Sequence, residues 1–359
     1  MPTAIVTGSG GLIGSESVRS LVEQGYRVIG LENDMRAYFF GADASTAATT
    51  AHLRRTHPEF RSLEVDVRDA AALDTVVKRH RGDLEVVVHT AGQPSHDWAV
   101  SEPQTDFAIN ANGTLNLLEA VKRHRPEATF IFCSTNKVYG DRPNALPLVE
   151  AETRLEIPAG HAYADGIGTS MSIDQSTHSL FGASKLAADV LVQEYGRYFD
   201  MPTVCFRAGC LTGANHAGAE AHGFLSYLMR CVVTGQRYTV FGYGGKQVRD
   251  NLHSSDVVAA FTAFHADPRP GAVYNLGGGR FSNCSLLEAV KIAERIAGRK
   301  LDRVYEARER TGDHRWWISD LAEFQRDHPA FAPRYGTEDL LREIYDANAE
   351  RWMALTRAG

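Results

Sequence analysis

Apolar positions change their spacing several times along the chain, and these changes predict the order of its elements. Ala4–Val6 is a short apolar run typical of a buried strand, and a glycine-rich stretch follows it at once. The next apolar residues recur at helical spacing: Leu12, Ile13, Val18, Leu21 and Val22. The first segment therefore predicts a strand, a tight turn and a helix.

Apolar runs of strand type and segments of helical period continue to alternate as far as residue 207. Strands are predicted at 27–31, 63–65, 84–89, 129–133 and 203–207, and helices at 69–80, 103–124 and 179–199. A regular strand–helix–strand order predicts an α/β fold with a parallel, doubly wound sheet. In such sheets, ligands bind at the carboxyl ends of the strands.

The pattern lapses between about residues 143 and 178, where Pro, Gly, Ser and acidic residues dominate. A loop this long in a compact domain is usually functional or disordered, and we expect it on the substrate side. Beyond Leu211 the pattern is irregular, with helices predicted at 223–234, 285–297 and 337–355 and strands at 238–241 and 273–276. We therefore predict a Rossmann domain over 1–210 and a smaller α/β substrate-binding lobe over 211–359, with segments near 250–278 returning to the main sheet.

The glycines after the first strand predict a phosphate site. Gly8, Gly11 and Gly14 permit a sharp turn and a close approach to a pyrophosphate, and the following helix offers unpaired N–H groups. An ordinary strand–helix turn could carry the same glycines. However, the second strand ends in Glu32, where a ribose-binding carboxylate is expected, and Asp66 follows the third strand. We predict NAD rather than NADP, because Glu32 would repel a 2′-phosphate.

Composition and charge narrow the class of protein. The net charge of −6 argues against a nucleic-acid or anionic-membrane partner. No apolar run approaches the roughly 18 residues of a membrane span, and the first strand begins too early for a signal peptide, so we expect a cytoplasmic protein. The five cysteines are scattered without a C-x-x-C pair, which predicts buried thiols and neither disulfides nor a metal site.

Taken together, the motifs resemble the extended short-chain dehydrogenase/reductase family of nucleotide-sugar epimerases and dehydratases. The resemblance runs from Thr7 to at least Asp320, and the stretches that carry it are His89–Gln93, Gly113–Val121, Ser134–Asp141 and Gly245–Asp250. Within the family the resemblance is to 2-epimerases of CDP-linked sugars. It implies a tightly held NAD that takes a hydride from a sugar carbon and returns it to the other face.

The family's base is usually a tyrosine four residues before a lysine, assisted by a Ser or Thr hydroxyl. Thr135 matches the hydroxyl and Lys185 the lysine, but Phe181 stands at the tyrosine position. Three explanations are open: a laboratory substitution that traps substrate, a native residue with another group as base, or a protein that binds without catalysing. The candidate replacement bases are Tyr163, His178 and Cys210.

The resemblance also implies the remaining contacts. Asn136 and Lys137 replace the acidic pair of sugar 4,6-dehydratases, which favours epimerisation. Arg249 and Arg310 match phosphate-clamping positions, with a structural Arg–Asp pair as the alternative for each. Arg207 ends a predicted core strand, and both a structural and a ligand-facing role are open for it. The other expected substrate contacts are Gln93, Ser179, Cys210 and His222. The expected cofactor contacts are Gly8, Gly10, Gly11, Leu12, Ile13, Gly14, Glu32, Asn33, Asp66, Val67, Thr90, Ala91, Gln93, Asn110 and Lys185.

The quaternary structure is a further expectation from the resemblance. Relatives pair through the two long helices that correspond to 103–124 and 179–199, forming a four-helix bundle. Both segments are long and apolar enough for this role. We therefore expect a homodimer.

Overall fold

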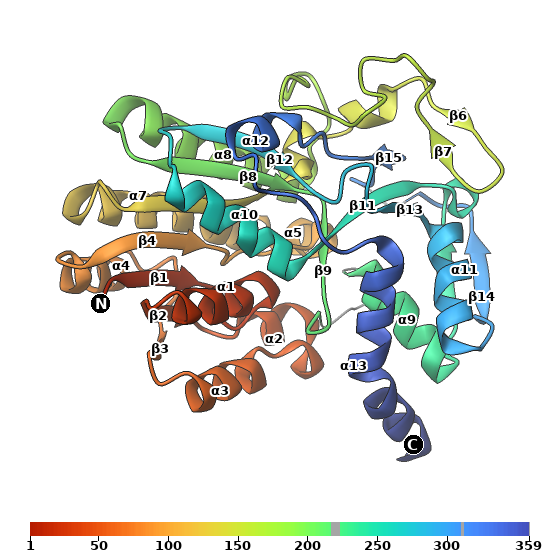
Figure 1. Ribbon diagram of the computed structural model, residues 1–359, viewed down its shortest axis with the longest axis horizontal. Helices are drawn as coiled ribbons and strands as arrows, with labels where there is room; N and C mark the ends of the chain where they lie inside the picture. The colour runs from red at the N-terminus through yellow and green to blue at the C-terminus, as the bar shows by residue number, and fades with distance from the viewer. Residues whose placement is uncertain (217–222, 310–311, 359) are drawn as a thin grey trace. The chain divides into compact units, whose positions relative to one another are not determined.

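The computed structural model describes residues 1–216, 223–309 and 312–358 (Figure 1). The chain forms two compact units and passes between them several times. The first unit comprises Met1–Val138, His178–Arg207 and Val257–Tyr274. The second unit comprises Tyr139–Thr177, Ala208–Asp256 and Asn275–Gly359.

A seven-stranded sheet organises the first unit, in the order β12-β8-β5-β4-β1-β2-β3. Its strands are β1 (Thr3–Thr7), β2 (Arg27–Glu32), β3 (Phe60–Glu64), β4 (Leu84–His89), β5 (Thr129–Thr135), β8 (Thr203–Ala208) and β12 (Ala272–Leu276). The central strand β1 runs parallel to both neighbours, with Ile5 opposite Ile29 of β2 and Val87 of β4. The predicted doubly wound parallel sheet is thus confirmed.

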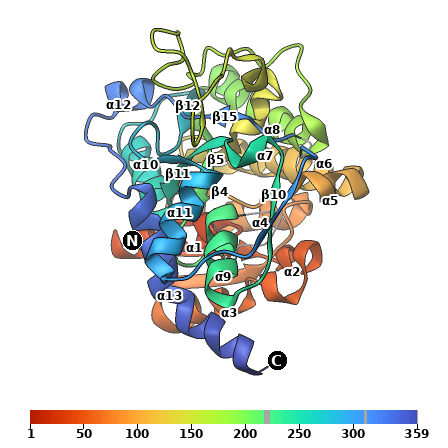
Figure 2. The same ribbon diagram turned by 90° about the vertical axis from the view of Figure 1, so that its right-hand side faces the viewer.

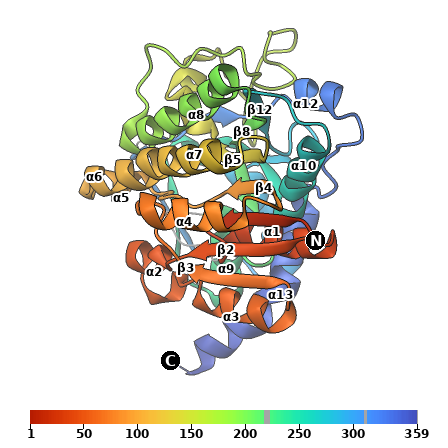
Figure 3. The same cartoon turned by 90° about the vertical axis from the view of Figure 1, so that its left-hand side faces the viewer.

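Helices cover both faces of this sheet. They are α1 (Leu12–Glu23), α2 (Met35–Phe40), α3 (Ala47–Thr56), α4 (Ala70–His80), α5 (His96–Ser101), α6 (Pro103–Phe107), α7 (Gly113–His124), α8 (Ser179–Phe199) and α10 (Ser254–Ala266), with short turns η1 (Ala42–Ala44) and η3 (Asn136–Tyr139). Figure 3 shows α4, α7 and α8 side by side on one face and α1 and α10 on the other. Tyr26, just after α1, hydrogen-bonds His265 of α10 at 2.9 Å.

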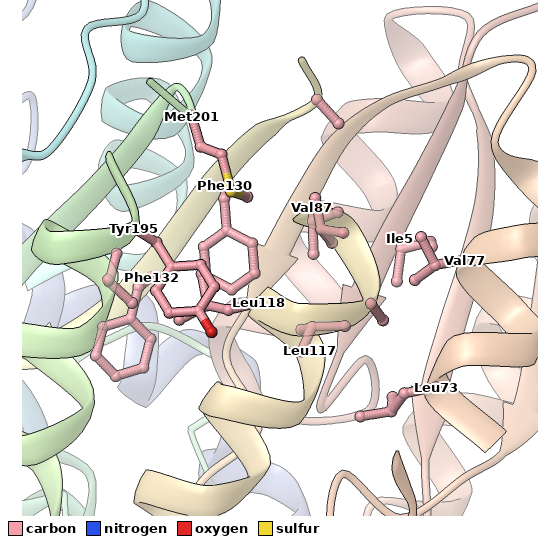
Figure 4. Packing of buried hydrophobic residues seen from close by; sticks show 14 of the residues in the cluster. Ile5, Leu73, Val77, Val87, Leu117, Leu118, Phe130, Phe132, Tyr195 and Met201 are labelled. Carbon is pink, nitrogen blue, oxygen red and sulfur yellow. The ribbon is translucent and has the colours of Figure 1, made fainter. Parts of the chain in front are cut away.

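The core of the first unit lies between the sheet and the layer of α4, α7 and α8. Phe130 and Phe132 of β5 pack there with Leu117 of α7 and Tyr195 of α8 (Figure 4). All four are buried, and three are essentially inaccessible to solvent. The helical period of the apolar residues on α7 and α8 directs them to this face, so burial of their apolar area holds the layer on the sheet.

The predicted helix over 103–124 is interrupted. It consists of α6, a π-helical turn η2 (Ala108–Asn112) and α7. Such wider turns are frequent at functional sites. Here the turn contains Asn110, whose side chain is buried in a polar network.

The described part of the second unit is built from short strands and four helices, three of which pack together. Its strands are β6 (Val149–Glu150), β7 (Leu155–Glu156), β9 (Cys210–Thr212), β10 (Tyr238–Phe241), β11 (Val248–His253), β13 (Asn283–Ser285), β14 (Arg303–Glu306) and β15 (Trp316–Trp317). Its helices are α9 (Phe224–Thr234), α11 (Leu286–Ala297), α12 (Ala322–Asp327) and α13 (Thr337–Ala358), with turns η4 (Arg142–Ala145) and η5 (Tyr243–Gly245). Strand β11 pairs with β9, β13 and β15 in a mixed sheet, and α9, α11 and α13 pack together (Figure 2). Among the described residues, no helix is both long and apolar enough to cross a membrane.

Candidate active site

The glycine turn after β1 is closely packed against its own backbone and against the end of β4. Gly8 has a φ of +64°, and a Cβ there would lie 2.9 Å from the Ala91 nitrogen. A Cβ at Gly14 would lie 2.0 Å from the Gly8 carbonyl oxygen. Gly11 donates its N–H to the same oxygen at 3.0 Å and precedes the first turn of α1, where Leu12 and Ile13 lie. Larger residues would therefore force this turn open.

Glu32, at the end of β2, hydrogen-bonds to the glycine turn. Its Oε2 accepts the Gly10 N–H at 2.8 Å, and its Oε1 accepts the N–H groups of Asn33 and Asp34. Next to it, the Asn33 side chain donates to Asp66 at 2.9 Å. Hydrogen bonds from Arg68 are the main cause that lowers the pKa of Asp66, so this carboxyl is ionised at neutral pH.

A buried chain of hydrogen bonds ties the ends of β1 and β4 to α7. Thr7 Oγ1 lies 2.7 Å from His89 Nδ1, and His89 Nε2 lies 2.9 Å from Thr114 Oγ1. Because Thr114 donates its own hydrogen to the Asn110 carbonyl, it accepts from His89, which assigns the proton to Nε2. Burial, with a smaller contribution from the Lys185 charge, lowers the pKa of His89 to about 3, so the ring stays neutral. The Thr90 hydroxyl donates to the Thr7 carbonyl, and the Ala91 N–H donates to the Thr7 hydroxyl.

A second buried network fixes the loop that follows β4. Gln93 donates from Nε2 to Asp106 at 2.7 Å, while its N–H reaches Asn110 Oδ1 at 2.9 Å. Asn110 in turn donates to Asp106 and to Ser184 of α8. Desolvation raises the pKa of Asp106. The side-chain amide of Gln93 therefore points into the protein, and its substrate contact stays a prediction.

Lys185 is anchored under the end of β5. Its ammonium donates to the Cys133 carbonyl at 2.9 Å and lies 4.1 Å from the centre of the Phe132 ring. Burial lowers the pKa of Lys185. Thr135 ends the same strand and accepts the Lys137 N–H, and Asn136 beside it is buried. The structure thus brings Lys185 and the predicted hydroxyl residue to one strand end.

Phe181 lies on the first turns of α8 and is buried. Its ring meets His96 edge-on, with centroids 5.0 Å apart, and His96 Nδ1 lies 2.8 Å from Ser179 Oγ. His178 directly precedes α8. Our sequence reasoning missed His96, although a histidine at a helix start, just after the motif ending in Gln93, was a usable signal.

The remaining predicted residues belong to the second unit or lie outside the description. Tyr163 is in the loop before α8, where its N–H reaches His161 at 3.1 Å, and Cys210 begins β9. Arg249 of β11 pairs with Asp313 at 2.5 Å. His222 and Arg310 lie outside the described residues. Within the described ranges, no group of His, Cys, Asp and Glu is arranged to hold a metal ion.

Comparisons with known proteins identify the family. The model of the NAD dependent epimerase/dehydratase family matches residues 4–277, and the chain belongs to this family. It is 29% identical to CDP-paratose 2-epimerase of Salmonella typhi, covering 95% of this chain and 98% of that one. It is 30% identical to UDP-glucose 4-epimerase of Pongo abelii over 86% of each chain.

A solved structure with the same fold is a mutant UDP-glucuronic acid 4-epimerase from Bacillus cereus in complex with a fluorinated UDP-sugar and NAD. The TM-score is 0.79 at 22% identity, with 97% of this chain and 99% of that chain covered. The glycine turn fits the nucleotide implied by the family, because a Cβ at Gly8, Gly10 or Gly14 would lie within 3.0 Å of other protein atoms, so only glycine keeps the tight backbone turn that a dinucleotide site requires.

Proposed function

We propose that the protein is an NAD-dependent nucleotide-sugar epimerase that oxidises and re-reduces one ring carbon, with C2 of a CDP-linked sugar as the expected substrate position. The observation that carries this is that one unit holds both the glycine turn closed by Glu32 and the buried Lys185 at the end of β5. The likeness to CDP-paratose 2-epimerase over nearly the whole chain supports the choice of carbon and nucleotide.

The chain's own residues divide the binding of NAD between them. The turn from Gly8 to Gly14 would hold the pyrophosphate, Glu32 the adenosine ribose hydroxyls, and Lys185 the nicotinamide ribose. When bound, NAD supplies a hydride acceptor that later returns the hydride. Nucleotide released by denaturing the purified protein should be NAD(H), and finding NADP(H) would contradict the role of Glu32.

Two features bear on the competing reactions. Elimination of water in sugar dehydration needs an acid and a base, and the amide of Asn136 and the ammonium of Lys137 cannot fill both roles. Phe181 has no ionisable proton and cannot act as the family's base. The second candidate function is therefore a protein that binds NAD and a nucleotide sugar without converting it. An active wild-type enzyme excludes that second candidate.

The test is incubation with CDP-, UDP- and GDP-linked sugars in deuterated water, followed by proton NMR. Inversion at C2 without uptake of deuterium supports return of the hydride to the same carbon. Uptake next to a carbonyl indicates keto–enol chemistry, and a new alkene signal indicates elimination. Binding of several sugars without conversion supports a non-catalytic protein.

A homodimer is part of the same proposal. Helix α8 exposes large apolar side chains, which are Leu180, Val190, Tyr198 and Phe199. Exposed apolar side chains on a long helix suit a helix-to-helix interface between two copies. Light scattering at micromolar concentration should give twice the chain mass, and a monomeric mass would contradict the proposal.

A further inference from the structure

A serine and a histidine from distant parts of the chain meet beside Phe181. His96 begins α5, and Ser179 begins α8. His96 Nδ1 lies 2.8 Å from Ser179 Oγ, and the imidazole packs edge-on against the Phe181 ring. A hydroxyl hydrogen-bonded to an imidazole is the arrangement by which proteins make a hydroxyl able to accept or give up a proton.

The neighbouring loop holds His96 in place. The Gln93 side chain hydrogen-bonds to both backbone groups of Ser95: it accepts from the N–H at 2.5 Å and donates to the carbonyl at 2.8 Å. The other hydrogen of the same Gln93 amide is bound by the buried Asp106. Ser95, directly before His96, is therefore part of the buried network, and this fixes the backbone that carries the His96 imidazole.

Ser179 is held in an unusual conformation. Its φ is +59°, which a residue other than glycine adopts rarely and at a cost of order 1–3 kcal/mol. Its Oγ accepts the Gly182 N–H at 3.2 Å, so this oxygen already has one donor. The hydroxyl hydrogen can then point to His96 Nδ1, and the other lone pair can face an incoming hydroxyl group. Such strain at a polar residue is characteristic of functional sites.

We propose that Ser179 and His96 together take the hydroxyl proton of the sugar, a step that the side chain of Phe181 cannot perform. The sugar O–H bond breaks, Ser179 Oγ gains that proton, and the original Ser179 hydrogen passes to Nδ1 to give an imidazolium. The reverse transfer restores the sugar hydroxyl. In total, one proton leaves the sugar hydroxyl and one proton is gained by His96, and no electron pair is transferred to either residue. Ser179 is the catalytic residue, because it contacts the sugar hydroxyl, and His96 acts by accepting the Ser179 hydrogen. The inference rests on the proposed epimerase function.

The kinetic test uses His96→Gln, which keeps a polar side chain but has no basic nitrogen, and Ser179→Ala. Each should lower kcat by about 100- to 10,000-fold, the usual contribution of a positioned base, with little change in KM or in the NAD that copurifies. The matched control is His52→Gln, an exposed histidine of α3 in the same unit, which should behave as wild type. Adding Phe181→Tyr to His96→Gln should restore about tenfold or more, because a phenol four residues before Lys185 supplies another base.

A measurement independent of turnover reports on the pair itself. In the protein labelled with ¹⁵N-histidine, Ser179→Ala should shift the Nδ1 resonance of His96 and leave that of His52 unchanged. An unchanged His96 resonance, or an active wild-type enzyme with an equally active His96→Gln variant, overturns the pair alone. A wild-type protein that inverts none of the sugars overturns the proposed function and the proton role together.

Discussion

Each unit contains an arginine–aspartate pair, and the two pairs differ in how completely the protein surrounds them. In the first unit, Arg207 binds Asp189 through two nitrogens, at 3.1 and 2.7 Å. The two side chains are only 5% and 0% exposed, and the Asp189 carboxylate also accepts from Ser134 and Gln193. In the second unit, Arg249 offers Asp313 one nitrogen, and the Asp313 side chain remains 27% exposed.

This difference separates a structural ion pair from one that can change partners. A buried carboxylate with four hydrogen bonds cannot be released without leaving an uncompensated charge, so the Arg207–Asp189 pair belongs to the fold. The Asp313 carboxylate, which is 27% exposed, can be hydrated when it leaves its partner. We therefore infer that Arg249 can exchange Asp313 for a phosphate oxygen of the substrate, since guanidinium binds both in the same way.

The largest expected effect comes from breaking the buried pair. Asp189→Ala should lower the free energy of unfolding by about 3–5 kcal/mol, because it leaves the Arg207 charge buried and unpaired. Urea denaturation measures this. The matched control is Glu194→Ala on the same helix, where the Arg197–Glu194 pair is 55% and 37% exposed, and less than about 1 kcal/mol should be lost. Equal losses for the two variants would show that burial does not distinguish the pairs.

The next effect concerns Asp250 of the second unit, a buried aspartate that accepts the N–H groups of Ser319 and Gly279. Desolvation raises the pKa of Asp250 to about 6. A raised native pKa stabilises the fold below the unfolded pKa, near 4, and this stability is lost as the pH rises through 6. As the pH rises from 4 to 6, ionisation of Asp250 should lower the free energy of unfolding by on the order of 3 kcal/mol, at about 1.4 kcal/mol per pKa unit.

Comparison with Asp250→Asn isolates this contribution from that of other titrating groups. The unfolding free energy of the wild type should fall more steeply between pH 4 and 6 than that of the variant. Tryptophan fluorescence reports mainly on the second unit, which holds three of the four tryptophans, Trp316, Trp317 and Trp352, all of them buried. Parallel pH profiles for the two proteins would mean that Asp250 does not cause the loss of stability between pH 4 and 6.

A smaller effect should separate binding from stability at Arg249. Arg249→Gln removes a charge-assisted hydrogen bond and should weaken nucleotide-sugar binding by about 1.5–3 kcal/mol, measured by calorimetry. The unfolding free energy should fall by less than in Asp189→Ala, because Asp313 is 27% exposed and can be hydrated once the Arg249 charge is removed. Asp313→Asn is the control and should bind the sugar at least as tightly as wild type. A strongly destabilised Arg249→Gln variant with unchanged binding would place both arginine pairs in the same structural class.

The smallest change is expected from Phe181→Tyr alone. The Ser179–His96 pair supplies the base, so turnover should change by less than about tenfold. A gain of roughly 100-fold or more would show instead that the missing phenol limits the reaction, as expected of a substitution that traps substrate.

Local patterns in the sequence were enough to predict the fold class and the glycine turn. Short apolar runs and period-3.6 spacing depend only on neighbouring residues, so the strands of the first unit and the helix that begins at Leu12 could be predicted directly. The same is true of Glu32, because the strand that carries it follows the first helix after a short turn. The π-helical turn at Asn110 could not be read this way, since the surrounding apolar spacing is that of one continuous helix.

The sequence by itself determined which chemical groups this protein has, and only the tertiary structure decided which of them meet. Nothing local distinguishes Arg207 from Arg249; burial and the number of partners do, and both depend on which strands and helices are neighbours. His96 and Ser179 are 83 residues apart, and they meet because α5 follows β4 while α8 packs beside β5, the next strand of the sheet. Strand order is a long-range property, so the candidate base beside Phe181 became visible only in the folded chain.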